Sequence, residues 1–383
     1  MTITFFSNFF NHHQKPLCDA FDVQVHVKFT FVTTIEMPLS FKKAGYNVPK
    51  TSYELRAHES TENWNRALQL IENSDIIIYG AVNDALFKQR VKANKLTFKY
   101  SERVFRKPWH IYDPRRILHL VRYHTVNYRK NYFLLCTGGY VANDYRKVMA
   151  FPNKKIKWGY FTAVKPLDLQ SILENKAKDI FKILFVGRLI PLKNPEILIA
   201  LGNELRKQNI KFEIEFVGVG PLEGKLKENI KQLRLQEYYT FTANVPNQTV
   251  LEKMRKAHVL IFSSNKEEGW GAVCNEALAN GCALVTTNEI GAAPFLIQPN
   301  KNGMIYKYGN LDELINIITH LQGDPELLHK IIRNGYKTIN ETWSPLNAVE
   351  NLLLFSKQLE SEEKIILEGP CSQTEYINYN WYL

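Results

Sequence analysis

Short apolar runs alternate with polar, periodically patterned stretches along the whole chain. Apolar runs of strand length predict buried β-strands at 2–6, 25–33, 75–79, 96–100, 132–136, 183–186, 213–217, 239–242, 259–262 and 283–286. The intervals carry helical periodicity, and the predicted helices include 114–128, 222–232, 272–280, 311–321 and 347–358. Strands that alternate with helices are typical of an α/β fold with doubly wound sheets.

The length of 383 residues favours two such domains over one. We expect a first Rossmann-like domain at 1–165 and a second at 181–345, joined by a linker at 166–180 where strand character is lost. The remaining segment, 346–383, contains a last amphipathic helix and a tail. From Glu363 onward this tail is expected to be poorly ordered or bound to a partner.

Composition excludes several classes of protein. Hydrophobic residues make up 45% of the chain, and no apolar run approaches the ~20 residues that span a bilayer. The first residues lack a basic region and a small-residue cleavage site, so no signal peptide is expected. The five cysteines are dispersed without a C-x-x-C pair, which favours reduced thiols in the cytoplasm over disulfides or a zinc site.

The net charge of +11 is concentrated in one segment. Residues 88–130 contain thirteen Lys and Arg residues but only two acids, so the rest of the chain is close to neutral. A solvated surface, an anionic membrane surface and nucleic acid are the three interpretations. We favour anionic lipid, because the predicted helix is basic and carries interleaved aromatic residues. These aromatic residues are Trp109, Tyr112, Tyr123 and Tyr128. No zinc finger, RNP-like or helix-turn-helix pattern supports nucleic acid.

The most informative stretch of the second half is 267–281. A buried strand breaks there into a glycine-bearing turn, and a short helix follows with Gly281 as its αL stop. The backbone N–H groups of Trp270 and Gly271 could bind sugar hydroxyls or phosphate oxygens. A carboxylate on the helix, Glu276, would suit a cis-diol such as ribose, because it accepts two O–H bonds. Two glutamates at this spacing also occur by chance and often only support a helix.

The turn after the strand at 183–186 carries Arg188 and, five residues later, Lys193. A diphosphate needs donors in fixed geometry, and a planar guanidinium with a compact ammonium provides them. In the first half, His12 and His13 lie where a strand passes into a helix, which is where open α/β sheets bind ligands. Helix capping or solvent exposure explains these histidines equally well.

Four motifs occur in order along the second half. They are Gly187-Arg188-Leu189-x-x-x-Lys193, Val217-Gly218-x-Gly220-Pro221-Leu222, Glu268-Gly269-Trp270-Gly271 with Glu276-Ala277-Leu278-Ala279-x-Gly281, and Asn302-Gly303-Met304-Ile305. Together they resemble the donor half of family-4, retaining glycosyltransferases over about 181–321. Residues 6–14 and 158–161 are similar, more loosely, to bacterial surface-polysaccharide members of that family. The resemblance implies a GT-B fold, with two Rossmann-like domains facing a cleft and a C-terminal helix that crosses back to the first domain.

The resemblance also implies residue roles. Arg188 and Lys193 would hold the donor diphosphate, and Glu276 would bind the ribose. The implied donor-binding set is Gly187, Arg188, Lys193, Val245, Glu268, Gly269, Trp270, Gly271 and Glu276. The candidate catalytic residues are Glu268, Arg188, Lys193, Glu102 and His13, and the acceptor-side residues are Asn11, His12 and His13. No metal and no separate cofactor are expected, because the Arg and Lys neutralise the departing diphosphate.

The chain departs from the family pattern at four places. His258 stands where an acidic residue often precedes the strand, and Ala283 replaces a usual Pro. The segment 291–295 lacks the expected carboxylate, and Glu102 stands where a His is common. These departures keep a catalytically impaired nucleotide-sugar-binding scaffold open as an alternative.

We expect a metal-independent, retaining hexosyltransferase of bacterial capsule or lipopolysaccharide synthesis. It would move a hexose-type sugar from a UDP- or GDP-linked donor to a glycan or lipid-linked acceptor. Its expected location is the cytoplasm, at the inner face of the cytoplasmic membrane, with residues 88–130 on anionic lipid. A basic nucleic-acid-binding protein is the alternative from a different class.

Overall fold

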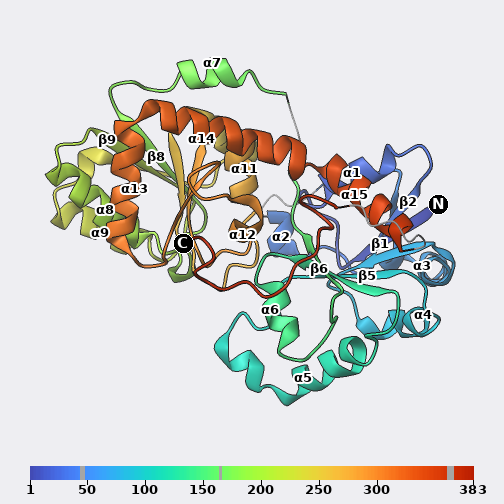
Figure 1. Ribbon diagram of the computed structural model, residues 1–383. Helices are drawn as coiled ribbons and strands as arrows, with labels where there is room; N and C mark the ends of the chain where they lie inside the picture. Colours follow the sequence, from blue (N-terminus) through green and yellow to red (C-terminus); the bar gives the residue numbers. More distant parts are fainter. Residues whose placement is uncertain (44–47, 164–165, 360–365) are drawn as a thin grey trace. The chain divides into compact units, whose positions relative to one another are not determined.

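A computed structural model describes residues 1–43, 48–163, 166–359 and 366–383 (Figure 1). The chain divides into two units. The first unit contains Met1–Ala163 and Trp343–Ile377, and the second contains Val164–Thr342 and Asn378–Leu383. In these described ranges, no helix combines the length and the apolar character that crossing a bilayer requires.

The first unit is built on a seven-stranded parallel sheet. Its strands are β1 (Thr2–Ser7), β2 (Lys28–Thr33), β3 (Glu54–Arg56), β4 (Ile76–Tyr79), β5 (Thr97–Ser101), β6 (Tyr132–Thr137) and β7 (Lys155–Trp158). They lie in the order β3-β2-β1-β4-β5-β6-β7, so the winding reverses between β1 and β4. The four residues of β4 and the six of β6 are all buried, as expected for parallel strands covered on both faces.

The helices of the first unit connect these strands. They are α1 (Lys15–Asp22), α2 (Leu39–Lys43), η1 (Ala57–Glu59), α3 (Thr61–Asn73), η2 (Asp84–Phe87), α4 (Lys88–Lys92), η3 (Pro108–Tyr112), α5 (Pro114–Leu120), η4 (Val121–Thr125), α6 (Val141–Arg146) and α15 (Pro345–Gln358). The last of these, α15, comes from the C-terminal part of the chain and packs on α1, which comes from the N-terminal part (Figure 1). Its Phe355 ring also contacts Phe98 of β5 and Phe133 of β6.

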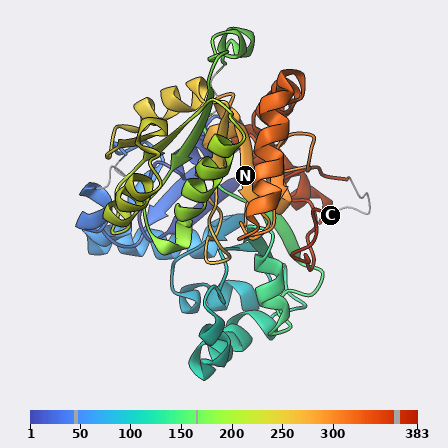
Figure 2. The ribbon, with the colours of Figure 1, turned by 90° about the vertical axis from the view of Figure 1, so that its left-hand side faces the viewer.

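The second unit has a six-stranded parallel sheet with the order β10-β9-β8-β11-β12-β13. The strands are β8 (Phe181–Val186), β9 (Phe212–Val217), β10 (Tyr239–Thr242), β11 (Val259–Phe262), β12 (Ala283–Thr287) and β13 (Met304–Tyr306). Its helices cover both faces of the sheet (Figure 2). They are α7 (Leu169–Glu174), η5 (Pro191–Lys193), α8 (Glu196–Lys207), α9 (Glu223–Gln232), η6 (Gln236–Tyr238), α10 (Asn247–Lys256), α11 (Val273–Ala279), α12 (Ala293–Leu296), α13 (Leu311–Gly323), α14 (Pro325–Lys337) and η7 (Thr338–Thr342).

Both sheets have the Rossmann order and lie in separate units, so the predicted fold class of two Rossmann-like, doubly wound domains is confirmed. The predicted strands are all present, with ends shifted by up to three residues. The structure adds β3, β7 and β13, and the long helices α3, α8, α10 and α14 were not predicted. β3 and β13 have only three residues each, too few for a periodicity.

The structure differs from the sequence-based expectations for the linker between the two units and for the C-terminal tail. The predicted linker at 166–180 contains α7 and groups with the second unit, because Leu173 is buried in that unit's core. The expectation of a poorly ordered tail is wrong for 366–383. There the backbone N–H groups of Cys371 and Thr374 donate to the carbonyls of Lys157 and Lys155. Glu363, where that expectation began, lies outside the described residues, as does Lys165, the predicted end of the first domain.

Candidate functional site

The predicted donor residues of the second unit lie at the point where its winding reverses. β8 and β11 are neighbours in the sheet, and their connecting helices leave in opposite directions. The turn after β8 begins at Gly187, and the turn after β11 begins at Ser263. Ligands of open α/β sheets bind in the crevice outside the carboxyl ends of two such strands.

Hydrogen bonds join the turns after β8 and β11. The Ser263 hydroxyl donates to the carbonyls of Lys193 (2.7 Å) and Asn194 (3.1 Å). The backbone N–H of Asn265 donates to the carbonyl of Leu192 at 3.0 Å. The position of the Lys193 backbone is therefore fixed by the strand next to its own.

The turn after β9 supports the same site through Gly218. Its φ is +136°, and a Cβ there would lie 2.2 Å from the carbonyl oxygen of Gly187. Only glycine allows this approach. The N–H of Leu189 donates to the carbonyl of Val219, which holds the turn that carries Arg188.

Lys193 and Glu268 form an ion pair in this crevice, with Nζ 2.5 Å from Oε2. Their side chains are only 14% and 18% exposed. Lys193 Nζ also lies 4.5 Å from the ring centroid of Phe262, the last residue of β11. Arg188 is exposed, and its side chain has no ion-pair or hydrogen-bond partner among the described residues.

The glycine turn offers donors to a ligand. Gly269 and Gly271 are buried, and within the described chain their backbone N–H groups donate to no protein acceptor. Buried N–H groups are nearly always paired, so these two are available to water or to a ligand. Trp270 is buried between them, and its Nε1 donates to Asn275 Oδ1 at 2.7 Å.

Glu276 lies in the first turn of α11 and is half-buried. Burial raises the pKa of Glu276 to about 7, and a side-chain hydrogen bond from Asn247 only partly opposes this shift. That bond is long, with Asn247 Nδ2 3.4 Å from Oε1. Asn247 begins α10 directly after the loop of the half-buried Val245, so the Val245 loop ends beside Glu276. Sequence reasoning missed Asn247 and Ser263, because neither belongs to a motif.

In the first unit, three loops at the carboxyl edge of the sheet meet around Tyr160. Its ring stacks on His13, with centroids 5.7 Å apart, and its hydroxyl donates to Glu102 Oε1 at 2.5 Å. Glu102 also pairs with Arg106. Burial and the neighbouring His12 lower the pKa of His13 to about 3, so its ring is neutral near pH 7.

The loop at 11–14 is held by its own side chains. Asn11 Oδ1 accepts from the N–H of His13, and Gln14 Oε1 accepts from the N–H of Asn11. The rings of His12 and His13 lie 3.9 Å apart. The structure thus brings His12, His13 and Glu102 into one region of the first unit.

A cavity of about 470 Å³ opens beside this loop, at the ends of β2 and β3. Phe9 and Phe10 provide apolar walls. Its carboxylates are Glu36, Glu54 and Glu59, and its cationic groups are Lys42 and Arg56. Aromatic walls with several carboxylates suit a hydroxyl-rich ligand.

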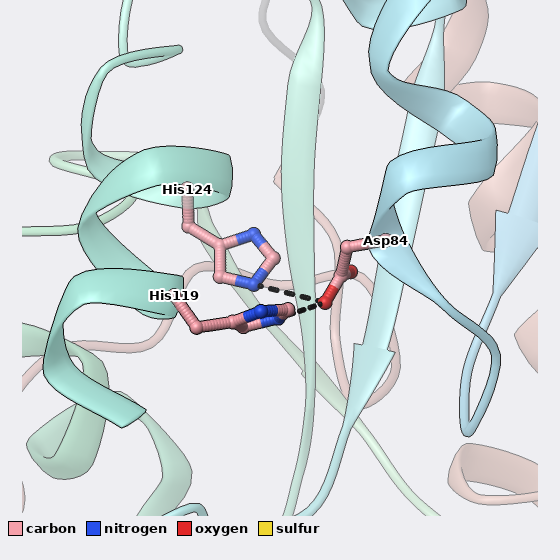
Figure 3. A group of neighbouring side chains, drawn as sticks. All are labelled: Asp84, His119 and His124. Carbon is pink, nitrogen blue, oxygen red and sulfur yellow. Dashed lines mark hydrogen bonds and ion pairs between the residues drawn. The ribbon is translucent and has the colours of Figure 1, made fainter. Parts of the chain in front are cut away.

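A polar cluster lies beneath α5 and η4 (Figure 3). Asp84 Oδ2 is 2.7 Å from His119 Nε2 and 3.7 Å from His124 Nε2. Asp84 Oδ1 accepts from Lys99 Nζ and from the Tyr79 hydroxyl, both at 2.8 Å. Burial alone would raise the pKa of Asp84, but the charge of Lys99 and the proximity of His124 hold it well below its usual range. Sequence reasoning missed this cluster, because five residues separate the two histidines.

The basic segment divides into buried and exposed residues. Arg90, Lys99 and Arg103 are internal: Arg90 donates to four backbone carbonyls, and the other two pair with Asp84 and Asp144. Lys92 and Lys95 are exposed at the end of α4, and the other exposed residues gather on η3, α5, η4 and the turns beside them. We call this set the basic-aromatic surface: Lys107, Trp109, Tyr112, Arg115, Leu118, Arg122, Val126, Tyr128 and Arg129.

The departure at His258 has a structural explanation. His258 Nδ1 accepts from the N–H of Lys182, and Nε2 lies 2.9 Å from the carbonyl of Ala177. Burial, with Lys176 nearby, lowers the pKa of His258 to about 4. A neutral ring thus ties β8 and β11 to the segment before β8.

Residues 170–338, most of the second unit, match the sequence family described as Glycosyl transferases group 1. A poly(glycerol-phosphate) alpha-glucosyltransferase of Bacillus subtilis is 27% identical over 50% of this chain and 27% of its own length. A D-inositol 3-phosphate glycosyltransferase of Paenarthrobacter aurescens is 30% identical over 33% of this chain and 32% of its own. The chain thus spans about a third or less of the length of these two relatives.

Solved structures match over nearly the whole chain. Anabaena Alr3699/HepE in complex with UDP has a TM-score of 0.67 at 15% identity, covering 94% of this chain and 100% of that one. Sucrose-phosphate synthase of Thermosynechococcus elongatus has a TM-score of 0.66 at 15% identity, covering 95% and 100%. Residues 170–338 therefore form a domain of the glycosyl transferases group 1 family, and the chain has the two Rossmann-like units of the GT-B fold.

Proposed function

We propose that this protein is a retaining glycosyltransferase that takes a hexose from a nucleotide-diphosphate sugar. The observation that carries the proposal is the meeting of Lys193 and Glu268 at the winding reversal between β8 and β11. The same crevice contains the unpaired N–H groups of Gly269 and Gly271. Relatives named as glycosyltransferases, and a similar fold solved with UDP-glucose, support a nucleotide sugar as the donor.

The donor diphosphate binds Arg188 and Lys193. Arg188 is exposed beside the turn, and Lys193 exchanges its Glu268 partner for a phosphate oxygen. Two cations at the leaving group stabilise the charge that develops on it, so the reaction needs no metal. Displacement of Glu268 from Lys193 frees a carboxylate to accept a hydroxyl of the donor sugar.

The ribose binds Glu276, whose two carboxylate oxygens accept its two hydroxyls. The base lies against Val245, which is half-buried and apolar. In the transfer step, the bond from the anomeric carbon to the phosphate oxygen breaks, and the acceptor oxygen bonds to the same face of that carbon. The acceptor proton passes to the leaving phosphate, which conserves the anomeric configuration.

Substitution of the donor residues tests the proposal. Arg188→Ala and Glu276→Ala should each lower kcat/KM with UDP-glucose or GDP-mannose roughly 100-fold or more, because each removes a charge-assisted contact. Arg333→Ala, an exposed arginine of α14, is the matched control. Wild-type turnover in both folded variants would disprove the site. Tight donor binding without hydrolysis or transfer to any acceptor would favour the impaired scaffold.

The acceptor binds the first unit, beside His13, Glu102 and the cavity walled by Phe9 and Phe10. We propose a glycan or lipid-linked glycan of a bacterial surface polysaccharide, since carboxylates and aromatic rings recognise sugar hydroxyls and faces. The conservative change Glu54→Gln should raise the acceptor KM and leave donor hydrolysis unchanged. An unchanged acceptor KM would remove the cavity from this role.

We further propose that the basic-aromatic surface docks on an anionic membrane. Trp109, Tyr112 and Leu118 are 61%, 83% and 68% exposed, beside Lys107 and Arg115. Exposed aromatic and aliphatic side chains among cations suit the interface of an anionic bilayer. Docking there would bring the protein to a lipid-linked acceptor.

Liposome flotation tests the docking surface. The chain should float with vesicles of anionic lipid and not with zwitterionic ones, and Trp109→Ala with Leu118→Ala should weaken flotation several-fold. Val25→Ala is the control, because Val25 is 92% exposed in the same unit and lies outside the surface. Equal flotation with both lipids would overturn the proposal. Salt-sensitive duplex DNA binding that UDP does not affect would point to nucleic acid instead.

A further inference from the structure

We propose that Asp84, His119 and His124 form a binding site for one divalent transition metal of the Zn²⁺ class, which fastens α5 and η4 to the first sheet. One ligand atom from each of the three residues lies within 4.8 Å of the others, and Asp84 Oδ2 is 2.7 Å from His119 Nε2 and 3.7 Å from His124 Nε2. Two imidazole nitrogens and one carboxylate oxygen are a ligand set that Zn²⁺ takes, with a further position for water.

The backbone brings the two histidines together through a π-helical turn. His119 belongs to α5 and His124 to η4, and an i→i+5 hydrogen bond runs from the N–H of Val126 to the carbonyl of Val121. In an α-helix, side chains five residues apart point roughly 140° apart. The wider turn moves His124 onto the side of His119, and Figure 3 shows both rings directed at the same carboxylate oxygen. Single π-turns within helices are frequent at functional sites.

The carboxylate is arranged to use one oxygen as a ligand. Lys99 and Tyr79 both contact Oδ1, whereas both histidines face Oδ2. Hydrogen bonds to the second oxygen of a ligating carboxylate orient it and are typical of metal sites. Lys99 therefore contacts the oxygen that the metal does not use.

The hydrogen bonds around His124 assign its protons. The Tyr79 hydroxyl donates its one hydrogen to Asp84, so in the contact between the two hydroxyls Tyr132 is the donor. The contact of 2.9 Å between Tyr132 and His124 Nδ1 must then be donated by the Nδ1–H of His124. In the neutral ring, Nε2 then presents a lone pair toward Asp84 Oδ2, 3.7 Å away, and a metal ion that binds both acceptors would stabilise this arrangement. A second-ring N–H held by a hydrogen bond also fixes the tautomer that a metal requires.

His119 gives the ion an entrance. Its side chain is 44% exposed, whereas those of His124 and Asp84 are 1% and 8% exposed. Without metal, the Nε2–H of His119 donates to Asp84 Oδ2. When a metal binds Nε2, the ring carries its proton on Nδ1 instead. Solvent therefore reaches the site at His119, whereas His124 and Asp84 are shielded from it.

Zinc titration of the tag-free full chain tests the inference. After chelator treatment, competition with a chromophoric zinc chelator should show one equivalent bound, and Zn²⁺ should raise the melting temperature. His119→Ala, a change at an exposed side chain, should weaken binding at least ~10-fold and abolish the rise in melting temperature. His26→Ala is the matched control, because His26 is an exposed histidine of the same unit.

Tyr132→Phe is a second variant, which removes only the partner of His124 Nδ1 and should weaken binding about 10-fold. The absence of saturable zinc binding to the wild-type chain would overturn the proposal. Zinc that binds equally well to His119→Ala would come from another site, such as a cysteine, and would overturn it as well.

Discussion

At the residue scale, the carboxylate of Glu276 is proposed to bind the donor ribose, and its ionised form lowers the stability of the unliganded protein. Its carboxyl has a pKa of about 7 in the folded chain, above its ordinary value of 4.5. The stability contributed by the protonated form is complete below pH ~4.5 and is lost as the pH rises through 7. A buried charge without a strong partner therefore remains in the unliganded protein at pH 8.

The change Glu276→Gln removes that charge and keeps the shape of the side chain. We expect it to raise the melting temperature relative to wild type at pH 8, with a smaller difference at pH 5, as measured by calorimetry. The same variant should bind UDP-glucose about 10-fold more weakly or worse, because a charged acceptor is lost. Glu228→Gln, an exposed position of α9, should change neither property. A melting difference that does not depend on pH would contradict this account.

Gly271 is a second residue at this site, and the turn after β11 requires glycine at its position. Its φ is +93°, and a Cβ would lie 2.5 Å from the ring of Phe262. Gly271→Ala should cost ~1–3 kcal/mol of folding stability and weaken UDP-glucose binding. Gly309→Ala separates the two causes, since Gly309 has a φ of +79° but no heavy atom within 4 Å of the added Cβ. Equal losses in both variants would mean that backbone strain alone is responsible.

The motifs identified residues that the fold places at one edge of the second sheet, and the roles of these residues stay predictions. Gly187, Lys193, Glu268 and Glu276 lie around one crevice because all four follow strands next to the winding reversal. The meeting of Asp84 with His124 could not be predicted, because neither the π-turn nor the pairing of β4 with β5 is visible in the spacing of side chains.

At the scale of elements, the N-terminus of α15 is set by the residues next to it in the sequence. Ser344 Oγ accepts from the N–H of Asn347 at 3.1 Å, and Pro345 begins the helix. We expect Ser344→Ala to destabilise the first unit by ~1 kcal/mol in denaturant unfolding. Ser60→Ala, which removes the analogous cap of α3, should have a similar effect. No loss of stability in either variant would show that solvent replaces the cap.

Strands were predicted more reliably than helices. A buried parallel strand is apolar at nearly every position, as β6 and β11 show, whereas α10 has a mainly polar sequence with only Val250 and Met254 buried. The segment of α7 was expected as a polar helical stretch of the linker, but Leu173 packs in the core of the second unit.

At the scale of the whole molecule, each unit has its own sheet and its own core. We expect UDP-glucose to slow amide hydrogen exchange mainly in peptides at 187–193 and 263–276, because binding closes those turns. The Glu276→Ala variant should lose this protection. Protection confined to the first unit would place the donor elsewhere.

The path of the chain through the two units determines which unit can fold first during synthesis. The first unit needs residues on both sides of Val164–Thr342, so this main segment of the second unit can fold while the first unit is still incomplete. At about 5–20 residues per second, synthesis reaches Ile377 roughly 10–45 s after Ala163. Until α15 has been made, α1, Phe98 and Phe133 lack its apolar cover, and exposed apolar surface of this kind is what makes incomplete domains prone to aggregate.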